Sequence, residues 1–237
     1  MPTSPQQHAR IEQSVYGHSY AGYRADPLFE SNLDRLIARF LAPNIREGGR
    51  VLDVGCGAGA FLRAAGRAHI AAQGIEISEA AAQICRDAGC QAEAAEFLTY
   101  GENRAFAAIT MWDVIEHLRE PQEFIRRAFD LLEPGGVFFS KTPIFGSLSV
   151  ALSNRAPRLA PVLLGAPDHV QYFNADNLAR LIEHAGFELI AREEVPEGLR
   201  TPPHGGSLRR RVVRSAMRTI ARWSGDSNLL ALARKPG

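Results

Sequence analysis

The sequence has few cysteines, no apolar N-terminal segment and no long hydrophobic run, which are the usual features of secreted or membrane-spanning proteins. Its three cysteines, Cys56, Cys85 and Cys90, are an odd number and form no C-x-x-C pair. This argues against a disulfide framework or a zinc site and fits a reducing compartment. The N-terminal stretch MPTSPQQHARIEQ is polar and lacks the apolar centre of a signal peptide. No apolar run approaches the roughly 20 residues of a membrane-spanning helix. We therefore expect a cytoplasmic protein.

The chain also lacks a strong net charge. The formal charge is +1 over 237 residues, and 46% hydrophobic with 22% charged residues is an ordinary globular composition. This near-neutral total hides an uneven distribution. Residues 1–199 contain 18 Lys and Arg against 25 Asp and Glu, whereas residues 200–237 contain nine against one. The main part of the chain is acidic, which argues against nucleic acid as a partner.

From Arg50 onward, short apolar runs alternate with amphipathic stretches. Strands are predicted over 50–55, 70–77, 106–112, 137–140, 187–190 and 228–233, and helices over 60–68, from Ser78 to Gly89, and over 120–132 and 174–185. Such alternation predicts a mainly parallel sheet with helices on both faces. Three regions lie outside the pattern. These are the helical residues 1–45, an apolar segment 143–168 that follows a strand and is placed to cover a ligand, and residues 195–226 between the last two strands.

The most informative segment is Val51–Gly59, VLDVGCGAG, in which a strand enters a glycine-rich turn before a helix. Glycines let the backbone turn tightly and approach a ligand closely, and the helix start offers unpaired N–H groups. Glu76 follows Gly55 by 21 residues at the end of the next strand. A carboxylate at that place can bind both hydroxyls of a ribose. Together these features predict an adenosine-containing ligand.

The glycines alone also satisfy the looser fingerprint of NAD-binding proteins. Asp53, two residues before the first glycine, argues against this, because a pyrophosphate is disfavoured next to another negative charge. A carboxylate there suits the amino group of an amino-acid ligand. The chain is also too short for the additional substrate domain of a dehydrogenase.

Several motifs, in order, resemble class I S-adenosylmethionine-dependent methyltransferases, in the group that includes ubiquinone-pathway O-methyltransferases. The motifs are VLDVGCGAGAFL, GIEIS, Glu96-Phe97, MWDVIEHLREP and LLEPGGVFFSKTP. The resemblance covers about residues 45–194 and resumes at 227–235. It implies a Rossmann-like, doubly wound α/β fold, with a seven-stranded sheet that is mostly parallel and has its last strand antiparallel.

The resemblance also implies the cofactor, S-adenosylmethionine, and the residues that bind it. The glycine loop, with Gly55, Cys56, Gly57 and Gly59, would hold the methionine part, Asp53 its amino group and Glu76 the ribose. Four further positions would complete the site: Ile77 against the adenine, Glu96 and Phe97 around its amino group and ring, and Met111 with Trp112 at the methionine end. Residues 1–45 would form an N-terminal lid on a methyltransferase domain over 46–237. Arg24 in this lid could meet the carboxylate of the cofactor, whereas helix packing explains its neighbours Tyr16, Tyr20 and Tyr23 equally well.

Methyl transfer needs alignment of the acceptor and, for an oxygen acceptor, a base as well. His117 follows a strand end beside the expected methyl group and is our first choice for base or substrate contact, with capping or packing at a helix start as the alternative. His169 could face the substrate or orient its loop. Glu116 and His117, with Asp168 and His169, could instead bind a metal, but we predict no metal.

Residues 207–224 form a predicted amphipathic basic helix. It could pack on the acidic domain, or contact an anionic membrane surface or substrate. The sequence thus predicts a methyltransferase acting on the hydroxyl of a small aromatic, lipid-like or sugar molecule. The alternatives are an N-methyltransferase, an S-adenosylmethionine-binding protein without transfer activity, and an NAD-dependent oxidoreductase.

Overall fold

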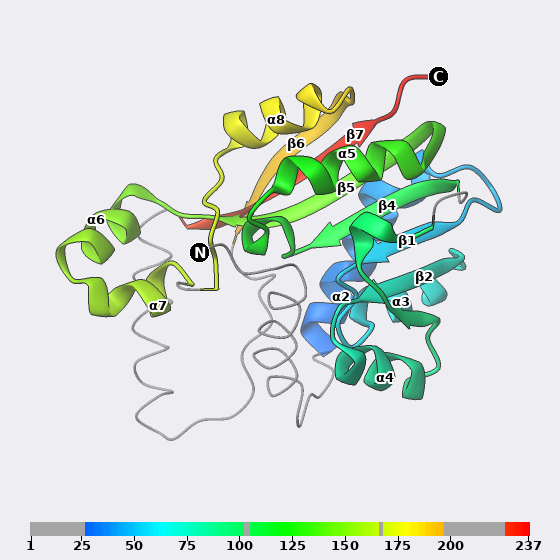
Figure 1. The fold of residues 1–237 in the computed structure, drawn as a ribbon, viewed down its shortest axis with the longest axis horizontal. Coiled ribbons are helices and arrows are strands. Elements are labelled where there is room, and N and C mark those ends of the chain that lie inside the picture. Colours follow the sequence, from blue (N-terminus) through cyan, green and yellow to red (C-terminus); the bar gives the residue numbers. More distant parts are fainter. Residues whose placement is uncertain (1–26, 102–104, 166–167, 197–225) are drawn as a thin grey trace.

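The computed structural model describes residues 27–101, 105–165, 168–196 and 226–237. The apolar runs form one seven-stranded sheet in the order β3-β2-β1-β4-β5-β7-β6 (Figure 1). Its strands are β1 Val51–Val54, β2 Ala72–Glu76, β3 Ala92–Ala94, β4 Phe106–Trp112, β5 Leu132–Ile144, β6 Glu188–Pro196 and β7 Ser227–Arg234. Strand β7 runs antiparallel to β5 and β6, and the other pairs are parallel. The predicted fold class is confirmed.

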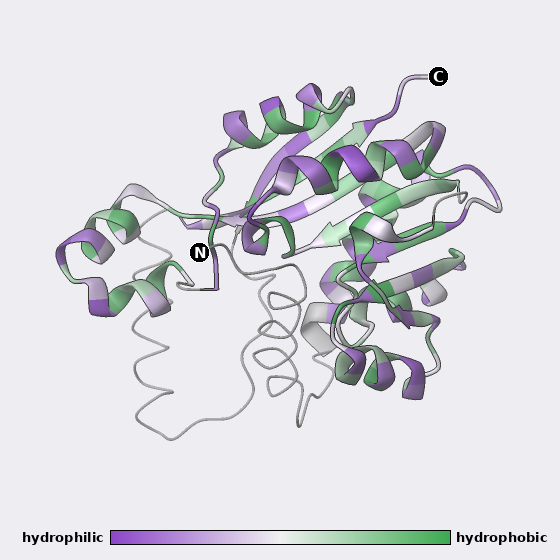
Figure 2. Ribbon diagram, viewed as in Figure 1, coloured by the Kyte–Doolittle hydropathy of each residue, from purple (hydrophilic) through white to green (hydrophobic). Residues whose placement is uncertain are grey.

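Amphipathic helices bury both faces of the sheet. Helices α5 (Pro121–Leu131) and α8 (Ala175–His184) share one apolar core with residues such as Phe138. Helices α2 (Pro27–Leu36), α3 (Ala60–Arg67) and α4 (Glu79–Asp87) contribute to a second core with residues such as Phe139. The central strands are largely hydrophobic, whereas the helices carry polar residues along one side (Figure 2). Because helices cover both faces of the sheet, side chains on both sides of each central strand are buried, and the strands appear in the sequence as continuous apolar runs.

Side chains cap the starts of two helices, at Ser78 as the sequence predicts and at Asn174, for which no cap was predicted. The hydroxyl of Ser78 accepts a hydrogen bond from the N–H of Ala81 at 3.4 Å, and Asn174 forms a capping box with Asn177. Strands β5 and β6 are longer than predicted. The Pro134–Gly136 turn lies inside β5, where pairing with β4 shifts register. The three-residue edge strand β3 was not predicted, because so short and exposed a segment has no apolar run.

The regions outside the alternation are partly described. Residues 27–44 are helical as predicted, with a π-helical turn Ile37–Leu41 and a 3-10 turn Ala42–Asn44 after α2. Beyond the carboxyl end of β5, the apolar segment forms α6 (Ser147–Arg155), a 3-10 turn Pro157–Leu159 and α7 (Ala160–Leu163), set apart from the sheet (Figure 1).

Two predictions lie outside the described residues. They concern the tyrosine cluster with Arg24, and the basic helix 207–224. The role of residues 1–45 as a lid stays a prediction. Among the helices that the structure does describe, none combines the length and apolarity needed to cross a membrane.

Candidate functional site

The glycine loop joins β1 to α3 in a conformation that requires glycine. Gly55, Gly57 and Gly59 have φ angles of +70°, +51° and +81°. A Cβ on Gly55 would lie 2.8 Å from Val114, and one on Gly59 would lie 2.6 Å from the Cys85 sulfur. The chain therefore turns where only glycine fits without strain, and its backbone is open to close approach by a ligand.

Glu76 lies beside this loop at the carboxyl end of β2. Its Oε2 accepts the N–H of Gly57 at 2.9 Å and its Oε1 accepts the N–H of Ser78 at 3.0 Å. The side chain is 8% exposed. A carboxylate has about four lone-pair positions, so one that accepts two backbone N–H groups can still accept from the hydroxyls of a ribose.

Asp53 lies on β1 under the glycine loop and is 2% exposed. The hydroxyl of Thr110 donates to its Oδ1 at 2.7 Å. Burial raises the pKa of the Asp53 carboxyl well above its ordinary value, and the hydrogen bond from Thr110 opposes this only in part. A cationic amino group placed against Asp53 would favour the ionised carboxylate again. The buried acid therefore fits the amino group of the predicted cofactor.

The other predicted cofactor residues lie along the same edge of the sheet with different exposure. Met111 is fully buried in the core, and Trp112 packs against Phe61 and Phe139 with ring centroids 5.5 and 4.7 Å apart. Cys56 and Phe97 are also buried, Ile77 is half-buried, and Glu96 is exposed just before the 3-10 turn Phe97–Thr99.

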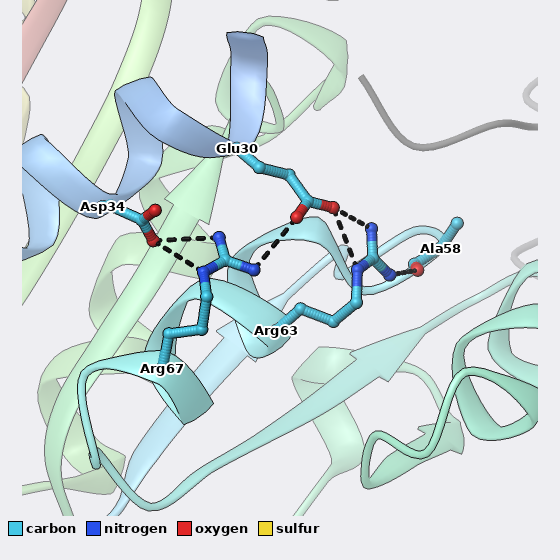
Figure 3. Close-up of polar contacts among 5 residues, drawn as sticks. All are labelled: Glu30, Asp34, Ala58, Arg63 and Arg67. Carbon is cyan, nitrogen blue, oxygen red and sulfur yellow. Dashed lines mark hydrogen bonds and ion pairs between the residues drawn. The ribbon is translucent and has the colours of Figure 1, made fainter. Parts of the chain in front are cut away.

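A contact that sequence analysis missed ties α2 to the glycine loop (Figure 3). Arg63 on α3 donates to the carbonyl of Ala58 at 2.7 Å and to Glu30 on α2 at 2.6 Å. Arg67 donates to the other oxygen of Glu30 at 3.0 Å and to Asp34 at 2.9 Å. Helix α2 thereby helps to fix the glycine loop, across 33 residues of sequence.

A second missed contact lies at the end of β4. Asp113 has φ +54°, a left-handed conformation that non-glycine residues rarely adopt. Both of its carboxylate oxygens lie 2.5 Å from Nζ of Lys141 on β5, and its N–H donates to the carbonyl of Lys141 at 2.8 Å. Lys141 is 1% exposed. The sequence contains only two lysines, Lys141 and Lys235, and this rarity was a signal that could have drawn attention to Lys141.

Glu116 begins a cluster of acid and imidazole groups next to this pair. It lies in the 3-10 turn Ile115–His117 and is 1% exposed. Thr142 donates to its Oε2 at 3.0 Å, while Oε1 has no hydrogen-bond partner among the described residues. Burial, together with the nearby charge of Asp113, raises the pKa of Glu116 to about 8.

The two predicted histidines meet beside Glu116. The rings of His117 and His169 lie 4.8 Å apart in an edge-to-face arrangement. Asp168 approaches His117 through its backbone carbonyl, 2.9 Å from Nδ1, and not through its carboxylate. Donor atoms of Glu116, His117 and His169 all lie within 4.8 Å of one another. Carboxylate and imidazole donors in such a group are also suited to a transition metal.

Comparisons with known proteins agree with this geometry. A family model described as a methyltransferase domain matches residues 21–192. A ubiquinone biosynthesis O-methyltransferase of Xanthomonas axonopodis pv. citri (strain 306) is 29% identical over 154 residues, which cover 60% of this chain and 64% of that protein. The chain thus spans less than two thirds of this relative.

Solved structures share the fold at low identity. Geranyl diphosphate C-methyltransferase from Streptomyces coelicolor A3(2), a complex with S-adenosyl-L-homocysteine, has a TM-score of 0.71 and 12% identity, covering 99% of this chain and 100% of that one. The cyclase SpnF has a TM-score of 0.65 and 21% identity, with 99% and 97% coverage. The fold therefore does not determine the reaction. Because the family model covers well over half of the sequence, the chain belongs to the methyltransferase domain family, as a class I S-adenosylmethionine-dependent methyltransferase.

Proposed function

We propose that this protein transfers a methyl group from S-adenosylmethionine to the hydroxyl of a small molecule. The observation that carries the proposal is the arrangement at the carboxyl edge of the sheet. Asp53 and Glu76 flank a glycine loop with left-handed residues, and a polar cluster lies beside them at the ends of β4 and β5. In open α/β sheets this edge binds the ligands.

The residues of the chain divide the work of binding. The glycine loop takes the methionine part, Asp53 its amino group and Glu76 the ribose hydroxyls. The adenine would lie against Ile77 and near Glu96 and Phe97, and the methionine end against Met111 and Trp112. The cofactor supplies a methyl group on a sulfonium, which leaves as a neutral thioether. The protein mainly has to align the acceptor, which can account for about 7–11 kcal/mol of the barrier.

His117 and His169 are proposed to contact the acceptor. Aromatic and apolar side chains adjoin them. Phe145 lies 6.0 Å from His169 and 5.6 Å from Tyr172, ring centre to ring centre. Tyr172 and Val170 are 44% and 45% exposed. This surface favours an aromatic or lipid-like acceptor over a fully polar one. The name of the ubiquinone-pathway relative supports oxygen over nitrogen as the acceptor atom.

Two measurements test the proposal. Calorimetry should detect binding of S-adenosylhomocysteine and none of NADH, and binding of NADH alone would refute the cofactor assignment. Transfer of labelled methyl from S-adenosylmethionine should then be measured with alcohol, phenol and amine acceptors. His117→Ala should lower turnover and leave S-adenosylhomocysteine affinity unchanged. Tight cofactor binding without transfer to any acceptor would favour the alternative of a binding protein without transfer activity.

We propose that the transfer needs no metal. Activity after dialysis against EDTA should equal that before dialysis. A loss of activity that Mg²⁺ or Zn²⁺ restores would instead assign Glu116, His117 and His169 to a metal site.

A further inference from the structure

The ion pair between Asp113 and Lys141 is built unlike an ordinary surface salt bridge. The Lys141 side chain is 1% exposed, whereas that of Asp113 is 36% exposed. A buried cation thus fixes a carboxylate that still reaches solvent. The backbone of Asp113 is left-handed, with φ +54°, which is uncommon outside glycine. Such a conformation persists only where the surroundings enforce it, and it is concentrated at functional sites. Here the carbonyl and the ammonium of Lys141 both hold Asp113 in place.

Further buried polar groups lie on the face of the sheet that carries the Lys141 side chain. Trp112 on β4 pairs in register with Lys141, and Asn228 on β7 pairs with Pro143, two residues beyond Lys141. Side chains at paired and alternate positions share a face. The indole N–H of Trp112 and both polar atoms of the Asn228 amide are buried and have no hydrogen-bond partner in the described part of the chain. Unpaired buried polar groups are rare in proteins, so this edge is prepared for a polar ligand.

We propose that Asp113 is a catalytic residue that accepts the proton of the acceptor hydroxyl, and that Lys141 is a second catalytic residue, which holds Asp113 and donates to the acceptor oxygen. This inference rests on the proposed function. Both carboxylate oxygens of Asp113 lie within hydrogen-bond distance of the Lys141 ammonium. An ammonium has three N–H bonds, so with two donated to Asp113 the third would serve the acceptor oxygen. The hydroxyl group would then donate to Asp113 and accept from Lys141.

This arrangement selects oxygen over nitrogen as the acceptor atom. A hydroxyl oxygen has two lone pairs, one for the methyl carbon and one for the N–H of Lys141. A neutral amine has a single lone pair, which the reaction itself needs. In the reaction the acceptor oxygen bonds to the methyl carbon while the carbon–sulfur bond breaks. The electron pair of that bond stays on sulfur, and the hydroxyl proton passes to the Asp113 carboxylate and from there to solvent.

The test compares two acceptors, catechol and 4-nitrocatechol, of which the second ionises much more readily. A base matters most for the acceptor that keeps its proton. Asp113→Asn should therefore lower kcat/KM for catechol by at least about 100-fold, within the usual range for general base catalysis. It should lower that for 4-nitrocatechol by less than about 10-fold. Lys141→Met should show the same selective loss. Both variants should bind S-adenosylhomocysteine in calorimetry as the wild type does, which shows that they fold.

Matched controls are Asp130→Asn and Lys235→Met. Asp130 is an exposed helix residue near Arg126, and Lys235 bonds the carbonyls of Phe129 and Leu132, so neither should change activity. An equal loss for both catechols would overturn the inference, as would a selective loss in His117→Ala but not in Asp113→Asn. A wild type that methylates benzylamine but neither catechol would overturn it and leave the methyltransferase assignment intact. Absent S-adenosylhomocysteine binding would refute the proposed function itself.

Discussion

The carboxyl ends of β1 and β2 differ from the carboxyl ends of β4 and β5, with the adjoining start of β7, in how their buried polar groups are paired. At the first, Asp53 is bonded to Thr110 at 2.7 Å, and Glu76 to the N–H groups of Gly57 and Ser78 at 2.9 and 3.0 Å. At the second, polar atoms of Trp112, Glu116, Ser227 and Asn228 are buried without a partner among the described residues.

The difference indicates what each edge requires. Paired carboxylates are held in place before any ligand arrives. The ends of β1 and β2, which form the proposed cofactor edge, are therefore preorganised by the chain itself. Unpaired buried groups destabilise a folded protein unless something satisfies them. At the ends of β4 and β5 and the start of β7, which form the proposed acceptor edge, we therefore expect a ligand to supply the missing hydrogen bonds. Variants at both edges can test this contrast.

The largest effect is expected from Asp53→Asn. Hydrogen bonds to charged groups contribute about 1.5–3 kcal/mol, so affinity for S-adenosylhomocysteine should fall about 10–150-fold. The pKa of Asp53 is raised by burial. Wild-type affinity should therefore weaken as the pH falls and the carboxyl takes up a proton, and the affinity of the variant should not change with pH. Calorimetry over a pH series measures both, and equal pH profiles would contradict the role given to Asp53.

Gly59→Ala, in the glycine loop, should lower the free energy of unfolding by about 2 kcal/mol. Alanine in a left-handed conformation is strained by about 1–2 kcal/mol, and the added methyl would lie 2.6 Å from the Cys85 sulfur. Gly66→Ala on α3 is the matched control. A Cβ there meets nothing within 4 Å, so helix propensity should make that variant more stable by about 0.5–1 kcal/mol. Urea unfolding gives both values. Similar behaviour of the two variants would show that the loop is not specific for glycine.

Glu116→Gln addresses the pH dependence of the acceptor edge. The folded state raises the pKa of Glu116 from 4.5 to about 8. The folded protein thus holds a proton that the unfolded chain releases near pH 4.5, and the stability from Glu116 is lost as the pH rises towards 8. In EDTA-containing buffer the variant should be more stable than the wild type at pH 9, by on the order of 2 kcal/mol, and similar at pH 4.5. Parallel pH profiles in urea unfolding would contradict this.

The smallest effect is expected for Asn228→Leu, which replaces a buried amide that has no partner in the described part of the chain with an apolar group of similar size. The unfolding free energy of the ligand-free protein should rise by about 1 kcal/mol, because no unmet hydrogen bond is left. Affinity for S-adenosylhomocysteine should not change. A loss of stability would mean that Asn228 is paired after all, and the contrast between the two edges would then fail.

Local patterns in the sequence were sufficient to single out the glycine loop and the two carboxylates beside it. Asp53, the glycines and Glu76 occur within one β-α-β unit, so their spacing along the chain predicts their spacing in space. The same holds for Ser78 as a helix cap. Segments without such a pattern were missed, such as the short strand β3.

The sequence by itself determined the fold class, the family and the glycine turn between β1 and α3, because these depend on strand–helix alternation and on local motifs. Only the tertiary structure decided which distant residues meet. It brought Lys141 to Asp113 across 28 residues, and His169 to His117. It also placed Cys85 in contact with Cys56 and Cys90, although the three share no motif. The physical reason is that the order of the strands sets these neighbours, and that order arises from packing of the whole sheet rather than from any local sequence.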